Sequence, residues 1–141
     1  MSKQPAITLL IKPASGSCNL RCRYCFYADE MNLRSEPTRG FMSGKTLELL
    51  VEKTLRQVSH TASFAFQGGE PTLVGLDFYR HLVELEKKYN ADGITINNSL
   101  QTNGIVLDEE WAQFLHDNHF LVGLSLDGYE ELHDENRKFP D

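Results

Sequence analysis

Apolar residues follow two alternating patterns along the chain: short apolar runs, of which residues 7–11 are rich in β-branched side chains, and longer stretches in which they are spaced three and four apart. The short runs predict strands at residues 7–11, 62–67, 94–101 and 120–126. The longer stretches predict amphipathic helices at residues 43–58, 76–89 and 108–118, and a fourth helix within residues 129–136. Ser43 and Asp108 are the expected N-caps. This alternation indicates an α/β fold with a parallel sheet, and periodicity alone leaves open a barrel or a doubly wound sheet.

Composition and charge narrow the class of protein. The chain has 141 residues, 40% of them hydrophobic, and 14 basic against 20 acidic side chains give a net charge of −6. This acidic balance argues against a nucleic-acid partner, because such proteins usually carry a basic patch. No apolar run approaches the ~18 residues of a membrane span, and the first residues lack the pattern of a signal peptide. We therefore expect a cytoplasmic protein with no membrane partner.

All three cysteines, Cys18, Cys22 and Cys25, fall within one short polar loop. An odd number of cysteines without a secretion signal makes a disulfide framework a poor explanation. Three thiolates can each bind one iron of a cubane cluster, which leaves one iron open to an exogenous ligand. A structural zinc site would need a fourth ligand, and no histidine pairs closely with this loop. Zinc and an unliganded group of thiols remain as alternatives.

Polar residues follow the later predicted strands, where parallel folds carry their functional loops. Gly68 and Gly69 allow close backbone approach to a ligand, and Glu70 beside them could accept hydrogen bonds from an ammonium group. An ordinary glycine turn is the alternative. Asn103 and Ser125 follow the third and fourth strands. Each is a candidate for ligand contact, with a turn or a capping role as the alternative.

The cysteine loop reads CNLRCRYC and resembles the CxxxCxΦC motif of radical S-adenosylmethionine (SAM) enzymes, with Tyr24 as the aromatic residue Φ. The segment QGGEP one βα unit later resembles the GGEP motif of the same enzymes. The wider segments CNLRCRYCFYADE, FAFQGGEPTLVG, NNSLQTNGIVLDEEW and FLVGLSLDGYEELHDENR resemble anaerobic sulfatase-maturating enzymes in order and spacing. The resemblance covers essentially the whole chain.

This resemblance implies a fold, cofactors and a set of site residues. The fold would be the N-terminal part of a partial (βα) TIM-like barrel, with about four βα units. Cys18, Cys22 and Cys25 would hold a [4Fe–4S] cluster whose fourth iron binds SAM, and reduction of the cluster would cleave SAM to a 5′-deoxyadenosyl radical. The implied SAM contacts are Tyr24 at the adenine, Gly68, Gly69 and Glu70 at the methionyl amino group, Ser125 at the ribose, and Asn103. By position alone, Tyr27 and Gln67 are candidates for a substrate pocket.

The activity implied by the resemblance is oxidation of a sulfatase cysteine or serine to Cα-formylglycine. Its partners would be a sulfatase polypeptide and a reductant such as flavodoxin or ferredoxin. Another peptide-modifying radical SAM enzyme is one alternative, and a non-catalytic iron–sulfur or zinc-binding fragment is another.

Members of that family are longer than this chain. We therefore expect residues 1–141 to be a radical SAM core domain truncated at its C-terminal side, with the general base beyond Asp141. A sheet that stops after the fourth strand would expose Leu121, Val122 and Leu124 along an edge. We expect such a chain to assemble its cluster poorly and to lack full activity.

Overall fold

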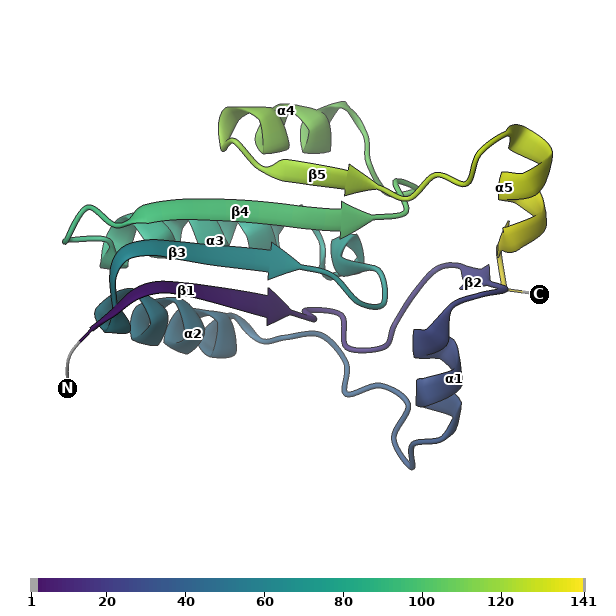
Figure 1. Ribbon diagram of the computed structural model, residues 1–141, viewed down its shortest axis with the longest axis horizontal. Helices are drawn as coiled ribbons and strands as arrows, with labels where there is room; N and C mark the ends of the chain where they lie inside the picture. Colours follow the sequence, from purple (N-terminus) through teal and green to yellow (C-terminus); the bar gives the residue numbers. More distant parts are fainter. Residues whose placement is uncertain (1–2, 141) are drawn as a thin grey trace.

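The computed structural model describes residues 3–140, which are built around a parallel sheet of four strands (Figure 1). These strands are β1 (Gln4–Ile11), β3 (Val58–Phe66), β4 (Thr95–Thr102) and β5 (Leu121–Leu124). They are paired in the order β1-β3-β4-β5, which is also their order along the chain, and every pair is parallel. The predicted α/β fold with a parallel sheet is therefore confirmed.

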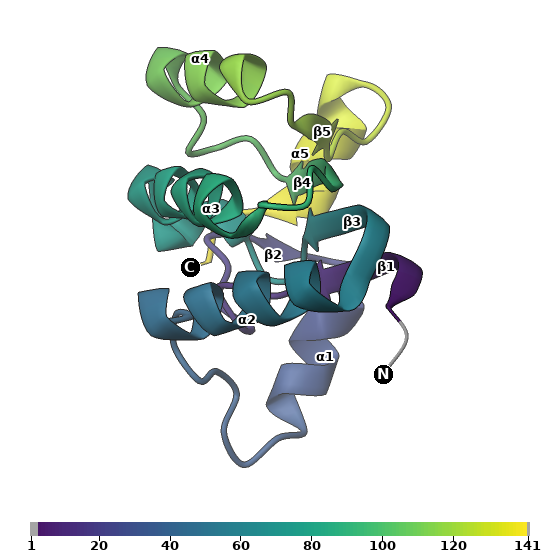
Figure 2. The same cartoon turned by 90° about the vertical axis from the view of Figure 1, so that its left-hand side faces the viewer.

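Three helices connect the sheet strands and lie together on one side of the sheet (Figure 2). They are α2 (Gly44–Gln57), α3 (Leu76–Tyr89) and α4 (Glu109–Asp117). A doubly wound sheet would carry helices on both faces, and its strand order would reverse at a switch point. The sequential strand order and the one-sided helices are those of part of a barrel, as the resemblance predicted.

The hydrophobic core lies between these helices and the sheet. Tyr79 of α3 is at its centre and packs edge-on against Phe66 of β3 and Trp111 of α4, with ring centroids 5.2 and 5.4 Å away. Its hydroxyl donates a hydrogen bond of 3.0 Å to the carbonyl of Pro71, so the one polar atom of this buried ring is satisfied. The core fixes the strands whose carboxyl ends form the site described below.

Both predicted N-caps are confirmed. The Ser43 Oγ accepts a hydrogen bond from the backbone N–H of Thr46 at 3.1 Å, and the Asp108 Oδ1 accepts one from Trp111 at 2.9 Å. Three strands differ from the prediction by more than one residue at a boundary. Strand β1 begins at residue 4 rather than 7, and β3 begins at residue 58 rather than 62, because Gln4 pairs with Val58. Strand β5 is confined to residues 121–124, which pair with residues 99–102.

The remaining elements are β2 (Arg21–Cys22), α1 (Phe26–Asn32), η1 (Pro71–Val74), α5 (Glu130–Asn136) and β6 (Arg137–Lys138). Of these, β2, α1 and α5 lie beyond the carboxyl ends of the sheet strands, to the right of the arrowheads in Figure 1. Only α5 was predicted. Strands β2 and β6 form an antiparallel pair in which Cys22 lies opposite Arg137, 115 positions away in sequence.

The face of the sheet opposite the helices carries polar side chains, among them Ser63, Ser99 and Gln101, none of which is buried. Strand β5 forms one edge of the sheet, and Leu121 and Leu124 are 74% and 58% exposed. The predicted exposure of this edge is confirmed.

None of the helices within residues 3–140 combines the length and hydropathy that crossing a bilayer requires.

Candidate functional site

A cavity of about 330 Å³ opens between the cysteine loop and the carboxyl ends of β3, β4 and β5. The structure brings all eleven site residues predicted from the sequence to the wall of this cavity. They are Cys18, Cys22, Tyr24, Cys25, Tyr27, Gln67, Gly68, Gly69, Glu70, Asn103 and Ser125. The cavity is within the size range of small-molecule sites in proteins. The role of each residue at a ligand remains a prediction.

The cysteine loop is ordered by local hydrogen bonds. Cys22 lies in β2, and Cys25 caps the start of α1 and donates a backbone hydrogen bond of 3.1 Å to the carbonyl of Cys22. The sulfur of Cys18 accepts a hydrogen bond from the N–H of Leu20 at 3.4 Å. Burial raises the pKa of the Cys18 and Cys22 thiols, so binding of a metal at these sulfurs must displace protons.

The arrangement of the three sulfurs bears on the choice between zinc and an iron–sulfur cluster. Within residues 3–140, no three or more side chains of His, Cys, Asp or Glu are grouped closely enough to hold one metal ion. A structural zinc site needs four such ligands around a single ion. In a cubane cluster, each sulfur binds a different iron, so the sulfurs need only face one cavity. The three cysteines meet this second requirement.

The glycine pair holds the second loop against the cysteine loop. Gly69 has a φ of +59°, and a Cβ there would lie 2.4 Å from the carbonyl oxygen of Ser17. The N–H of Glu70 donates a hydrogen bond of 2.8 Å to the same oxygen. The sequence predicted a close approach of this backbone to a ligand. The close approach that the structure shows at Gly69 is to the carbonyl oxygen of Ser17, next to Cys18.

Glu70 is only 2% exposed, and its carboxylate is held by four donors. Its Oε1 accepts hydrogen bonds from the N–H and hydroxyl of Thr72 at 3.1 and 2.7 Å, and from the hydroxyl of Thr102 at 2.7 Å. Its Oε2 accepts one hydrogen bond, of 2.8 Å, from the N–H of Asn103. Oε1 is shared among three donors, whereas Oε2 uses only one of its two lone pairs, so Oε2 keeps one acceptor position for a ligand.

Asn103 combines a turn role with a position beside the cysteines. Its Oδ1 accepts from the N–H of Ile105 at 3.1 Å, as in an Asx turn. Its Nδ2 donates to the Oδ1 of Asn19 at 2.8 Å and lies 4.0 Å from the sulfur of Cys18. Both interpretations of Asn103 thus have support in its contacts.

The other predicted residues line the cavity with fewer contacts. The hydroxyl of Ser125 accepts a hydrogen bond of 3.0 Å from the side-chain amide of Gln101. The ring of Tyr27 lies under the ammonium group of Lys12, whose Nζ is 3.9 Å from the ring centroid. The hydroxyl of Tyr24 donates a hydrogen bond of 2.5 Å to Asp127.

Sequence reasoning missed Arg137, which completes one wall of the cavity, and the contact that Asp127 makes with it. Arg137 donates to Asp127 Oδ1 at 3.0 Å and places Nη1 3.9 Å from the sulfur of Cys22. The hydrogen bonds from Tyr24 and Arg137 hold the pKa of Asp127 below its usual range. No local signal marks Arg137, because the pairing of β2 with β6 brings it to the cysteine loop.

The cavity places one acidic and one basic side chain on the same wall as the three cysteines. Among the described residues that line it, Glu70 is the one acidic and Arg137 the one basic side chain. The Nε of Arg137 is buried and has no hydrogen-bond partner within residues 3–140, so it can donate to an acceptor. Glu70 Oε2 can accept from a donor. Together they present one free donor and one free acceptor, the pair that a carboxylate and an ammonium group require.

Comparison with known proteins assigns the fold and the cysteine loop to a family. Residues 13–140 match the Radical SAM superfamily. The chain belongs to this superfamily. The match spans the cysteine loop, the glycine pair and Arg137, so the whole cavity lies within the radical SAM region.

The chain is similar to a cysteine-type anaerobic sulfatase-maturating enzyme of Clostridium perfringens. The two are 52% identical over 134 residues, a match that covers 95% of this chain and 36% of the relative. It is also similar to a serine-type anaerobic sulfatase-maturating enzyme of Bacteroides thetaiotaomicron. These two are 42% identical over 131 residues, a match that covers 92% of this chain and 31% of the relative. The chain therefore spans about a third of the length of these relatives.

Solved structures agree with this assignment. The structure described as "Native anSMEcpe with bound AdoMet" superposes with a TM-score of 0.88 at 51% identity, covering 96% of this chain and 36% of that one. A second, "Native anSMEcpe with bound AdoMet and Cp18Cys peptide", superposes with a TM-score of 0.88 at 51% identity, covering 96% and 35%. The fold of this chain is thus the corresponding third of a radical SAM sulfatase-maturase fold.

Proposed function

We propose that this chain is the cluster- and SAM-binding core of an enzyme that oxidises a cysteine or serine of a sulfatase to formylglycine. The observation that carries the proposal is the meeting of all three cysteines with Glu70 and Arg137 at one cavity. The names of its relatives and the AdoMet bound in the similar solved structures support it.

The [4Fe–4S] cluster and SAM together would supply a 5′-deoxyadenosyl radical, which would remove a hydrogen atom from the substrate residue. The chain's own residues bind and orient the reactants for this step. The sulfurs of Cys18, Cys22 and Cys25 would each hold one iron, and Glu70 and Arg137 on the wall of the same cavity would hold the amino acid part of SAM. A charged pair at opposite ends of that head group fixes its orientation.

The roles of the wall residues toward SAM, apart from that of Arg137, are those that the family resemblance implies. Glu70 Oε2, with Gly68 and Gly69, would contact the ammonium group of SAM, and Arg137 Nε would donate to its carboxylate. Tyr24 would lie against the adenine, and Ser125 would contact the ribose. Asn103 holds the loop between Glu70 and the cysteine loop.

The substrate and partners follow from the same proposal. Tyr27 and Gln67 lie on the cavity wall and would contact the substrate residue. The substrate would be a sulfatase polypeptide, and the peptide in a similar solved structure supports this class. A one-electron reductant such as flavodoxin or ferredoxin is required. A cytoplasmic location is part of the proposal, because a reducing compartment keeps the three free thiols available for iron.

The first test is reconstitution of the chain under anaerobic conditions with iron and sulfide. We expect equal amounts of bound iron and sulfide, a reduced-state electron paramagnetic resonance signal, and a change in that signal when SAM is added. Cys22→Ser is the control that removes one ligand, and it should lose most of the iron. Tight binding of zinc with no uptake of iron, or a signal that SAM leaves unchanged, would refute the proposal for the cofactors.

The second test addresses the substrate. Two peptides with the same sequence around the target, one with cysteine and one with serine, are incubated with the reconstituted chain, SAM and a chemical reductant. Because the chain spans about a third of its relatives and is expected to lack full activity, the readout is SAM cleavage rather than formylglycine. Faster formation of 5′-deoxyadenosine with either target peptide than with a peptide that lacks the cysteine or serine would support a maturase substrate. A rate that neither target peptide changes would point to another radical SAM reaction.

A further inference from the structure

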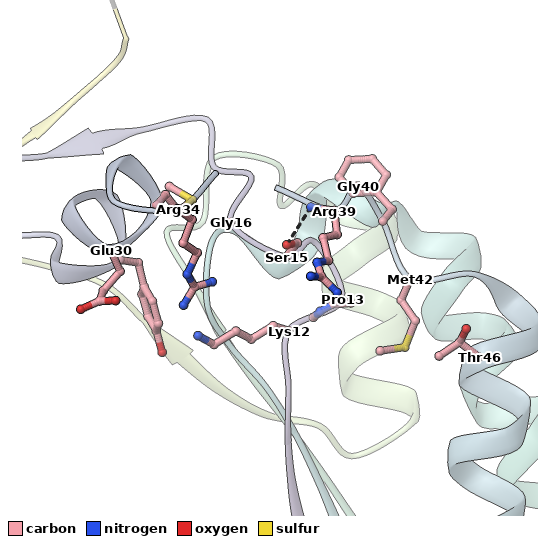
Figure 3. A pocket seen from close by; sticks show the side chains of 13 residues that line it. Lys12, Pro13, Ser15, Gly16, Glu30, Arg34, Arg39, Gly40, Met42 and Thr46 are labelled. Atoms are coloured by element: carbon pink, nitrogen blue, oxygen red, sulfur yellow. Dashed lines mark hydrogen bonds between the residues drawn. The ribbon is translucent and has the colours of Figure 1, made fainter. Parts of the chain in front are cut away.

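The cavity lined by the three cysteines, proposed above to hold the cluster, is called the cluster-binding cavity from here on. A second cavity, of about 570 Å³, lies next to it and has no role in the proposed function (Figure 3). Its wall is formed by the end of β1, by α1, and by residues 39–46 at the start of α2. Tyr27 lines both cavities. One aromatic side chain is therefore shared between this second cavity, here called the basic groove, and the site of the three cysteines.

The charges of the basic groove are unlike those of the chain as a whole. Among the described residues, Lys12, Arg34 and Arg39 line it against a single carboxylate, that of Glu30, whereas the chain carries a net charge of −6. In Figure 3 the ends of Lys12 and Arg34 point toward one another. Within residues 3–140, neither side chain takes part in an ion pair. Like charges that face each other in this way are relieved by an anionic partner.

The exposure of these cations favours a large anionic partner over a small anion. Lys12 and Arg34 are exposed, and the side chain of Arg39 is 85% exposed, with Glu36 3.7 Å from its Nε. A small anion is usually held by fixed, buried donors, whereas exposed cations around an open groove suit the acidic side chains of another protein. On an acidic chain, a local group of cations also steers an acidic partner to one place.

We propose that the basic groove is the docking surface for the acidic protein that delivers the electron to the cluster. The inference rests on the function proposed above. The donor loses one electron and the cluster gains it, so no bond forms or breaks during transfer. The shared Tyr27 explains the location, because a donor seated in the groove lies behind the wall of the cluster-binding cavity.

The test is the binding of an oxidised flavodoxin to the reconstituted chain, measured by calorimetry at low salt. We expect Arg34→Glu to weaken binding about tenfold, because it reverses a charge at the interface. Arg34→Lys keeps the charge and should bind within about twofold of the original chain. Lys53→Glu is the matched control, since Lys53 is an exposed cation of α2 outside the groove, and it should leave binding unchanged.

Salt and a chemical reductant separate this inference from the proposed function. Raising the salt from about 0.1 M to about 1 M shortens the screening length from about 10 Å to about 3 Å, so the difference between Arg34→Glu and the original chain should disappear. With a chemical reductant, Arg34→Glu should cleave SAM at the original rate. If the original chain cleaves no SAM even then, the proposed function fails rather than the docking surface.

Three outcomes would overturn the inference. Equal loss of flavodoxin binding in Arg34→Glu and Lys53→Glu would show an effect of total charge alone. Loss of sulfatase-peptide binding in Arg34→Glu, with flavodoxin binding intact, would make the groove a substrate surface. Loss of inorganic phosphate binding in Arg34→Glu, with flavodoxin binding intact, would make it a site for small anions.

Discussion

Glu86 of α3 and Asn98 of β4, which are buried and hydrogen-bonded to each other, should make the stability of the chain depend on pH. Glu86 is 6% exposed, and its Oε2 accepts a hydrogen bond of 3.0 Å from Asn98 Nδ2. Within residues 3–140, Glu86 Oε1 and Asn98 Oδ1 are both buried without a partner. Burial raises the pKa of Glu86 to about 7, against the hydrogen bond from Asn98, which lowers it. In the protonated form the buried carboxyl carries no charge and gains a donor, and the partnerless Oδ1 of Asn98 is an acceptor on the residue that already binds Oε2.

The sign and size of the effect follow from linkage. A pKa that is higher in the folded chain than its ordinary value of 4.5 means that the folded state binds the proton more tightly. This contribution is fully present below 4.5 and is lost as the pH rises through about 7. At about 1.4 kcal/mol for each pH unit of difference, ionisation of Glu86 should lower the free energy of unfolding by about 3 kcal/mol.

The variant Glu86→Gln removes the titration and keeps the shape, because a glutamine amide can donate to Asn98 Oδ1 at any pH. Urea unfolding of the metal-free chain, followed by circular dichroism, gives the free energy of unfolding at about pH 5 and about pH 9. We expect the variant to gain about 3 kcal/mol relative to the original chain between these two values. Glu131→Gln, at an exposed position on α5, is the control and should show no such gain. A difference between Glu86→Gln and the original chain that stays constant across this range would refute the reasoning.

Three further predictions concern the cluster-binding cavity. Gly69→Ala places a Cβ 2.4 Å from the oxygen of Ser17 at a positive φ, so urea unfolding should show a loss of about 2–4 kcal/mol, and iron uptake should fall with it. Glu70→Gln keeps the three hydrogen bonds to one oxygen but turns an amide NH₂ group toward the N–H of Asn103. The loss of that acceptor should lower the free energy of unfolding by about 2–3 kcal/mol in urea. An unchanged unfolding midpoint would contradict the role of the hydrogen bond from Asn103. Arg137→Ala should weaken SAM binding, measured by equilibrium dialysis, by about tenfold with the iron content retained, and Arg137→Lys should restore part of the affinity. Equal SAM affinity in both Arg137 variants and the original chain would remove Arg137 from the site.

The order of elements and most of the cavity wall could be predicted from the sequence because they depend on short-range patterns. A helix N-cap such as Ser43 is recognised by the bond it makes three residues away. In parallel folds of this kind, the strand order places the carboxyl ends side by side. Residues at the ends of separate strands, such as Glu70 and Ser125, therefore meet at one edge of the sheet.

The tertiary structure decided what depends on contacts between distant parts of the chain. Arg21 and Arg23 flank the cysteines in sequence, but Arg23 pairs with Glu135, and Arg137 is the cation that reaches the sulfur of Cys22. The antiparallel pairing of β2 with β6 causes this, and no local periodicity encodes a pair of two-residue strands so far apart. The sequence by itself thus determined the chemical groups and the strand ends that carry them. Long-range pairing decided which charge lies beside the thiols, because that contact depends on two segments 115 positions apart in sequence.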